Sequence, residues 1–225
     1  MTTSTDNYFL IYADPPWGYA DVRTGGSFQS GAGQQYPVMT VADIAALPVA
    51  EVCAPNAILG LWATNPNLPA AITVMASWGF QYKTTWPWLK TGRLGLGRWG
   101  RVDVEFLLVG IRGQVKPPLL PSETSSFSAP VGSHSAKPQE ARDRMERVAA
   151  RCFGSWETIV TPVPGRDRPK YTQHLMSLAT DLPSLELFAR ETAPGWDCLG
   201  HDLGESVEAG LARIAAAQRA AFSLV

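Results

Sequence analysis

The four residues Asp14, Pro15, Pro16 and Trp17 have the types and spacing that best suit chemistry in this chain. An exocyclic amine on an aromatic base is a poor nucleophile, because its lone pair is delocalised into the ring. Two acceptors facing its N–H groups help to free that lone pair, and the Asp14 carboxylate and Pro15 backbone carbonyl are adjacent acceptors. The Pro15 carbonyl is expected to lack a helix partner because Pro16 follows it, and the Trp17 ring offers a flat face for a base. These residues predict a catalytic site for an aromatic amine; a proline-rich turn around a buried tryptophan is the alternative.

The residues on either side of this run must position it. Tyr8–Ala13 is apolar and rich in aromatic or β-branched side chains, which predicts a buried strand that the prolines end. Asp14 then lies at the carboxyl end of a central strand, outside which ligands bind in open α/β sheets. The segment 18–36 is rich in glycine and serine and long for a connection, so it is expected to be an active-site lid, with an ordinary surface loop as the alternative.

The remaining elements follow from apolar periodicity and from glycine and proline punctuation. The sequence predicts strands over residues 57–63, 84–90, 105–112 and 185–189, and a strand and turn over 195–202. Because Pro87 cannot donate to a sheet ladder, the strand 84–90 is expected to be bulged or at an edge. Helices are predicted over 40–47, 68–77, 138–151 and 205–222, whereas 114–131 and 154–183 are expected to be irregular.

Composition limits the class of protein. A chain of 225 residues with 45% hydrophobic and 17% charged residues suits a single α/β domain over residues 1–225, and a formal net charge of −1 excludes a globally basic nucleic-acid binder. The three cysteines, Cys53, Cys152 and Cys198, have neither zinc-site nor disulfide spacing, which favours a reducing, cytoplasmic environment. No apolar run reaches membrane-spanning length, and the three histidines do not have the spacing of a zinc site, so neither a membrane nor a metal is expected.

Positive charge is nevertheless concentrated locally. Between Lys83 and Lys116 there are seven basic and two acidic residues, interleaved with Trp86, Trp88 and Trp99. Such a surface could hold phosphates while its aromatic rings stack on bases. A solvated loop beside core tryptophans is an equally good interpretation.

In order along the chain, several motifs resemble those of the MT-A70-like methyltransferases, which transfer a methyl group from S-adenosylmethionine (SAM) to the exocyclic amine of adenine. The match runs from about Tyr8 to Leu203. Besides Asp14–Trp17 it includes Tyr36, Leu61-Trp62-Ala63-Thr64-Asn65, Trp78-Gly79-Phe80, Trp88-Leu89-Lys90, Arg101, Glu105-Phe106-Leu107-Leu108-Val109-Gly110, Arg112-Gly113, Ser133-His134-Ser135-Ala136-Lys137-Pro138, Glu186-Leu187-Phe188-Ala189-Arg190 and Gly195-Trp196.

The resemblance implies the fold. It is an α/β, doubly wound, mostly parallel and Rossmann-like sheet with permuted motif order, in which the catalytic strand comes first and the cofactor-binding helix and strand come last. Because these two strands are neighbours in the family, Asp14 and residues 186–190 are expected on either side of the switch point. The segment 152–184 is longer than the usual link and is interpreted as an insertion over the cofactor or the nucleic-acid surface.

The resemblance also implies roles for single residues. Asp14, Pro15, Pro16 and Trp17 would be catalytic, with Trp17 and Tyr36 flanking the adenine. Lys137 would pair with the methionine carboxylate of SAM, Arg190 would contact its ribose, and Asp14 would lie near its methionine end. Further matching positions are expected to bind substrate (Asn65, Lys90 and Arg101) or cofactor (His134, Ser135, Phe188, His201 and Asp202). Where the family reads Gly-Asn-Glu or Gly-Asn-Gln, this chain has Gly200-His201-Asp202, whose side chains can still form hydrogen bonds.

The expected function is therefore SAM-dependent methylation of adenine in nucleic acid, in DNA before RNA because the chain is compact. Two alternatives stay open: a catalytically inactive nucleic-acid-binding partner subunit on the same fold, and a methyltransferase for small-molecule amines. Neither the recognition sequence nor the choice between a monomer and a homodimer follows from the sequence.

Overall fold

The computed structural model describes residues 7–18, 38–92, 100–117, 123–132, 136–161, 170–180 and 182–222. Its centre is a seven-stranded sheet in the order β5-β3-β4-β2-β1-β8-β9. These strands are β1 (Tyr8–Ala13), β2 (Cys53–Ala63), β3 (Gln81–Thr91), β4 (Val104–Arg112), β5 (Phe127–Pro130), β8 (Ser184–Leu187) and β9 (Asp197–Leu199). Only β4 is antiparallel to its neighbours, so six strands of this sheet share one direction. The predicted mostly parallel α/β sheet is confirmed.

The middle of the sheet joins the two ends of the sequence. β1 pairs in parallel with β2 on one side and with β8 on the other. The chain continues from β1 towards β2 but from β8 towards β9, so the carboxyl ends of β1 and β8 flank a topological switch point. The adjacency of these two strands, expected from the family resemblance, is confirmed.

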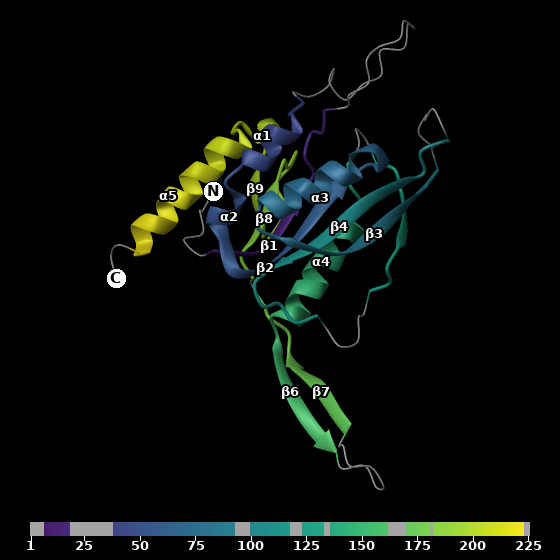
Figure 1. Ribbon diagram of the computed structural model, residues 1–225, viewed down its shortest axis with the longest axis vertical. Coiled ribbons are helices and arrows are strands. Elements are labelled where there is room, and N and C mark those ends of the chain that lie inside the picture. The colour runs from purple at the N-terminus through teal and green to yellow at the C-terminus, as the bar shows by residue number, and fades with distance from the viewer. Residues whose placement is uncertain are drawn as a thin grey trace, which may run out of the picture.

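Helices cover both faces of the sheet, and the alternation of side chains along each strand explains how (Figure 1). Ile11 and Ala13 of β1 belong to a core that also contains residues of α1 (Val41–Ala46), α2 (Val49–Val52), α3 (Leu68–Ser77) and α5 (Val207–Phe222). Leu10 and Tyr12 belong to a second core that contains residues of α4 (Gln139–Cys152). The short 3-10 helices η2 (Asn65–Asn67) and η4 (His201–Leu203) follow β2 and β9.

The four predicted helices are all present, and the strands around the site differ from expectation mainly in their bounds. For β3 the proline argument is confirmed: β5 pairs only with Trp88–Thr91, so β3 is an edge as far as Pro87, and its register shifts between Tyr82 and Thr84. No helix in the described part of the chain is long and apolar enough to cross a membrane.

Two segments expected to be irregular contain strands, and those predictions were wrong. β5 forms inside 114–131, where it pairs with β3 and where the Trp88 Nε1–H donates to the Ala129 carbonyl at 3.0 Å. β6 (Ser155–Thr161) and β7 (Lys170–Ser177) form an antiparallel ribbon inside 154–183. Prolines and a glycine cluster in the sequence between β6 and β7, and this cluster obscures the alternation on either side. The ribbon extends away from the sheet beyond the carboxyl end of α4 (Figure 1).

Candidate active site at the ends of β1 and β8

The Asp14–Trp17 segment forms a tight turn directly after β1. The Trp17 backbone N–H donates to the Pro15 carbonyl at 2.8 Å, and the Met39 N–H donates to the Pro16 carbonyl at 3.0 Å. The Pro15 carbonyl therefore has no helix partner, as expected, but it does accept one local hydrogen bond. A carbonyl oxygen has two lone pairs, so it can accept a second hydrogen bond from a ligand.

The Trp17 ring lies mostly inside the protein. The residue is 5% exposed, and its indole N–H donates to the Trp62 carbonyl at 3.0 Å. Trp17 therefore fixes the turn against the end of β2 and offers a ligand only a small part of its surface.

The centre of the site is a chain of four charged side chains that come from four segments. Lys137 Nζ lies 2.8 Å from Asp14 Oδ2 and 3.4 Å from Glu105 Oε2, and Lys90 Nζ lies 2.6 Å from Glu105 Oε1. Asp14 follows β1, Glu105 is the second residue of β4, Lys90 is the second-last residue of β3, and Lys137 precedes Pro138, the N-cap of α4. Two carboxylates and two ammonium groups leave this set of four side chains formally neutral, which permits their burial.

The protonation states of Glu105 and Lys137 follow from their surroundings. Burial alone would raise the pKa of Glu105, but the ammonium groups of Lys137 and Lys90 outweigh it and hold this pKa below its ordinary value. Burial alone would lower the pKa of Lys137, but Asp14 and Glu105 outweigh it and raise this pKa. At neutral pH Glu105 and Lys137 are therefore both ionised.

Aromatic rings form a layer beneath the charges. Tyr12, Trp62, Trp88 and Trp196 meet edge to face, with ring centroids 6.0–6.4 Å apart. The Trp62 Nε1–H donates to the Tyr12 hydroxyl at 2.7 Å, which satisfies both buried polar groups. Lys137 Nζ lies 5.5 Å from the centroid of a Trp62 ring, within cation–π range. This layer holds the ammonium group from below while Asp14 and Glu105 hold it from the sides.

The opposite side of the switch point is built by the end of β8. Phe188 has a φ of 64°, a left-handed conformation that is strained for a residue with a side chain. The Ala189 N–H donates to the Leu199 carbonyl at 2.9 Å, and a Cβ atom on Gly200 would lie 1.9 Å from the Ala189 carbonyl oxygen. The backbone at residues 188–190 is therefore fixed by a close approach that requires glycine at position 200.

A second ion pair connects α4 to β8. Arg142 Nη2 lies 2.6 Å from Glu186 Oε2, and the Arg142 guanidinium lies 5.8 Å from the Tyr12 ring centroid. Burial raises the pKa of Glu186 above its ordinary value, although Arg142 opposes the rise. This pair positions the face of α4 that packs on the sheet.

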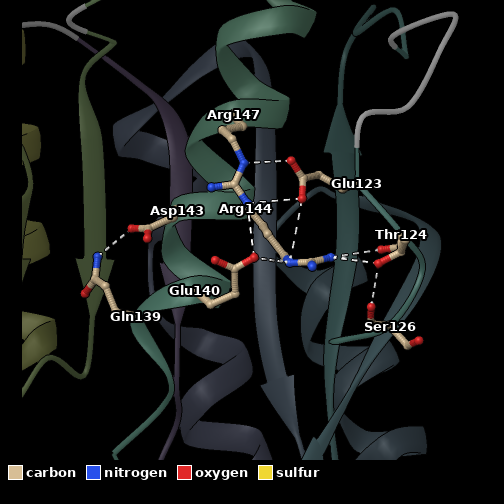
Figure 2. Close-up of polar contacts among 8 residues, drawn as sticks. All are labelled: Glu123, Thr124, Ser126, Gln139, Glu140, Asp143, Arg144 and Arg147. Atoms are coloured by element: carbon tan, nitrogen blue, oxygen red, sulfur yellow. Dashed lines mark hydrogen bonds and ion pairs between the residues drawn. The ribbon is translucent and has the colours of Figure 1, made fainter. Parts of the chain in front are cut away.

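The outer face of α4 is held by a separate network (Figure 2). Glu123 accepts hydrogen bonds from Arg147 at 2.7 and 3.1 Å and lies 3.7 Å from Arg144. Arg144 also pairs with Glu140 at 2.7 Å and donates to the Thr124 carbonyl at 3.1 Å. These contacts connect α4 to the segment that leads into β5.

The other predicted site residues do not all join the four charged side chains around Asp14. Lys90 joins the charged chain, whereas Asn65, Arg101, His201 and Asp202 are exposed and Arg190 and Phe188 are partly buried. Asn65 follows the carboxyl end of β2, and Arg101 precedes the reversed strand β4, so both lie at the catalytic edge of the sheet. Tyr36, His134, Ser135 and nearly all of the predicted lid 18–36 lie outside the described residues.

The described residues of the locally basic segment 83–116 do not form one surface. Trp86 and Trp88 are core residues, 7% and 1% exposed, so the core interpretation is confirmed for both. Arg112 donates to the Ala50 carbonyl at 2.6 Å, at the end of β4 away from the site. Arg93, Arg98 and Trp99 lie outside the described residues. Within the residues that the structure describes, no three histidine, cysteine, aspartate or glutamate side chains come together as a metal site.

Sequence reasoning quoted Glu105 only as part of a motif and assigned it no role, although it is the residue that connects both lysines. An acid at the start of a strand as apolar as 105–112 is a signal of a buried, paired charge. Tyr12 and Trp62 were likewise not expected to support the site.

The mostly parallel sheet with one reversed strand is consistent with a Rossmann-like methyltransferase fold. The family model described as MT-A70 matches residues 8–157, and the chain belongs to this family. The matched range ends inside β6, earlier than the Leu203 given by the motif resemblance.

Proteins that are similar to this chain include two named methyltransferases. The type II methyltransferase M.MunI of Mycoplasma sp is 30% identical over 183 residues, which are 70% of this chain and 78% of that protein. The human N(6)-adenine-specific methyltransferase METTL4 is 22% identical over 212 residues, which are 86% of this chain and 37% of that protein.

Proposed function

We propose that this protein transfers the methyl group of SAM to the exocyclic N6 amine of adenine in DNA. The observation that supports this most is the Asp14 carboxylate, held after β1 at the switch point and 2.8 Å from Lys137 in a chain of the MT-A70 family. METTL4 is named an N(6)-adenine-specific methyltransferase, which supports N6 of adenine as the atom that is methylated. M.MunI is named a type II methyltransferase, which supports DNA over RNA as the substrate.

The residues present suit the cofactor. The methionine end of SAM bears a carboxylate and an ammonium group, and the site offers both signs of charge: the Lys137 ammonium and the Asp14 carboxylate 2.8 Å from it. We assign Lys137 to the cofactor carboxylate and residues 188–190 at the end of β8 to its nucleoside part. The strained φ of Phe188 supports this second assignment, because such strain gathers at binding sites.

Catalysis then requires positioning more than proton chemistry. When bound, SAM supplies a methyl group that its sulfonium has already activated. Asp14 and the Pro15 carbonyl accept hydrogen bonds from the amine and hold it in line with that methyl group. The Asp14 carboxylate also stabilises the positive charge that develops on the amine nitrogen. The methylated nitrogen then releases one N–H proton to solvent, and the demethylated cofactor leaves as S-adenosylhomocysteine. A paired adenine must first leave the base stack, at a cost of about a few kcal/mol, so single-stranded or mismatched adenine is expected to react at least as well.

The test is incubation of the protein with methyl-labelled SAM and separate pools of DNA and RNA oligonucleotides, with and without adenine. Digestion and mass spectrometry then identify the labelled nucleoside. The proposal requires N6-methyldeoxyadenosine in adenine-containing DNA and none with Asp14→Asn. Label in RNA alone would assign RNA as the substrate. Transfer only in a parallel reaction with small-molecule amines would favour the small-molecule alternative. SAM binding without any transfer would favour the inactive partner subunit.

A further inference from the structure

Glu105 occupies a position that only the reversed strand can supply. β4 runs opposite to its neighbours, so its first residues, and not its last, lie at the edge where Asp14 is found. Its two carboxylate oxygens are divided between two cations: Oε1 lies 2.6 Å from Lys90 Nζ and Oε2 lies 3.4 Å from Lys137 Nζ. The side chain is 12% exposed, so water contributes little to its solvation.

The balance of charge between the two carboxylates and the two lysines determines how many ammonium groups contact Asp14. With Glu105 present, each lysine has a carboxylate, and Asp14 is contacted by Lys137. Without it, Asp14 is the one carboxylate left among these four charged side chains, and the side chains of both lysines are only 12–13% exposed. Poorly solvated cations are strongly attracted to the remaining anion. Asp14 would then be held by two ammonium groups, and fewer of its lone pairs would face the substrate amine.

We infer that Glu105 is a positioning residue for methyl transfer: it holds Lys90 and Lys137 so that an Asp14 oxygen stays open to the adenine amine. This inference rests on the proposed function and goes beyond it, because Glu105 touches neither substrate nor cofactor in this role. Its effect is on turnover. Cofactor affinity changes little, because Lys137 remains present and positively charged when Glu105 is removed.

The decisive variant is Glu105→Gln, which keeps the size of the side chain and removes its charge. We expect single-turnover methyl transfer to slow about 10- to 100-fold, as misplacement of reacting groups typically does. The Kd for the SAM analogue sinefungin, measured by calorimetry, should stay within about threefold of wild type. Glu105→Asp, which keeps the charge but cannot span both lysines, should fall between wild type and Glu105→Gln.

The chain offers a matched control. Glu123 also bridges two cations and has a side chain that is 9% exposed, but it lies on the outer face of α4 (Figure 2). Glu123→Gln should lower the melting temperature and leave the turnover of the folded protein within about twofold of wild type. If both variants lose turnover only in proportion to lost folded protein, Glu105 is merely structural and the inference is overturned.

A double-mutant cycle isolates the lysine that Glu105 restrains. If Lys90 binds Asp14 when Glu105 is absent, Glu105→Gln should cost less in a Lys90→Met background than in wild type. An equal cost in both backgrounds, or a Glu105→Gln variant as fast as wild type, overturns the inference alone. A folded wild-type protein that methylates no nucleic acid instead refutes the proposed function.

Discussion

Asp14→Asn is the sharpest test of the assigned chemistry, because the change removes one charge and almost no volume. The amide oxygen can still accept, but the NH2 group would face either the substrate amine or Lys137. Loss of one preorganised polar partner at a reacting centre costs about 100- to 1,000-fold in turnover. We expect an effect of at least this size, since Asp14 supplies one of only two acceptors that we assign to the amine.

The stability cost of the same change should be smaller than its catalytic cost. The Asp14 side chain is 25% exposed, and Lys137 keeps Glu105 at 3.4 Å, so the variant leaves no buried ammonium without a carboxylate. Breaking a fully buried pair costs about 3–5 kcal/mol, and the retained partner should bring the value nearer to the 1.5–3 kcal/mol of a single charged hydrogen bond.

The assay combines single-turnover methyl transfer with urea unfolding followed by tryptophan fluorescence. Asp14→Ala serves as the second variant, because it removes the acceptor without placing an NH2 group opposite the amine. A folded Asp14→Asn protein with near-normal turnover would refute the role of this carboxylate. A variant that unfolds before activity can be measured is assayed at lower temperature with SAM in excess, because a bound ligand stabilises the folded protein.

Three further results are expected. Lys137→Ala should weaken sinefungin binding more than tenfold in calorimetry, because a charge-assisted pair to a carboxylate is worth about 1.5–3 kcal/mol; unchanged affinity would contradict the assignment. Gly200→Ala should lower both melting temperature and sinefungin affinity, because its Cβ would lie 1.9 Å from the Ala189 carbonyl oxygen, and an unaltered variant would show that residues 188–190 can shift freely. The pKa of Glu105 is depressed in the fold, so its stabilisation is present above its unfolded pKa of about 4.3 and is lost as the pH falls through the folded value. The difference in unfolding free energy between wild type and Glu105→Gln should therefore shrink between pH 6 and pH 3.5, and a constant difference would argue against the ion pairs.

The parts of the site that could be predicted from the sequence are those that depend on residues adjacent in the chain. The strand before Asp14, the prolines that end it and the Pro138 boundary of α4 are local signals, and the structure places all of them as expected. The contact of Glu105 with Lys137 and Lys90 is different, because it depends on the direction of β4 and on β3, β4 and the residue before the N-cap of α4 meeting at one edge. No window of the sequence contains that information.

The sequence did not predict β5 for a related reason. β5 has four residues, ends in Pro130 and exists because it pairs with β3, a partner that its own composition does not reveal. The Trp17 ring was expected to offer a face for a base, yet it lies in the core, because a residue type alone does not show which side of a turn is buried. Local propensity thus locates the catalytic strand, and long-range pairing decides what surrounds it.

The pairing of β1 with β8 determines when the protein can become active during its synthesis. Leu10 is in register with Ser184, 174 positions later. The strand β1 therefore lacks β8, one of its two neighbours in the sheet, until most of the chain has been synthesised. At about 5–20 residues per second this delay is roughly 9–35 s, during which one edge of an apolar strand has no native partner. A nascent chain in that state is exposed to aggregation through this edge. Such a long sequence separation also raises contact order and slows folding, so the switch point between β1 and β8 is expected to be among the last parts of the molecule to form.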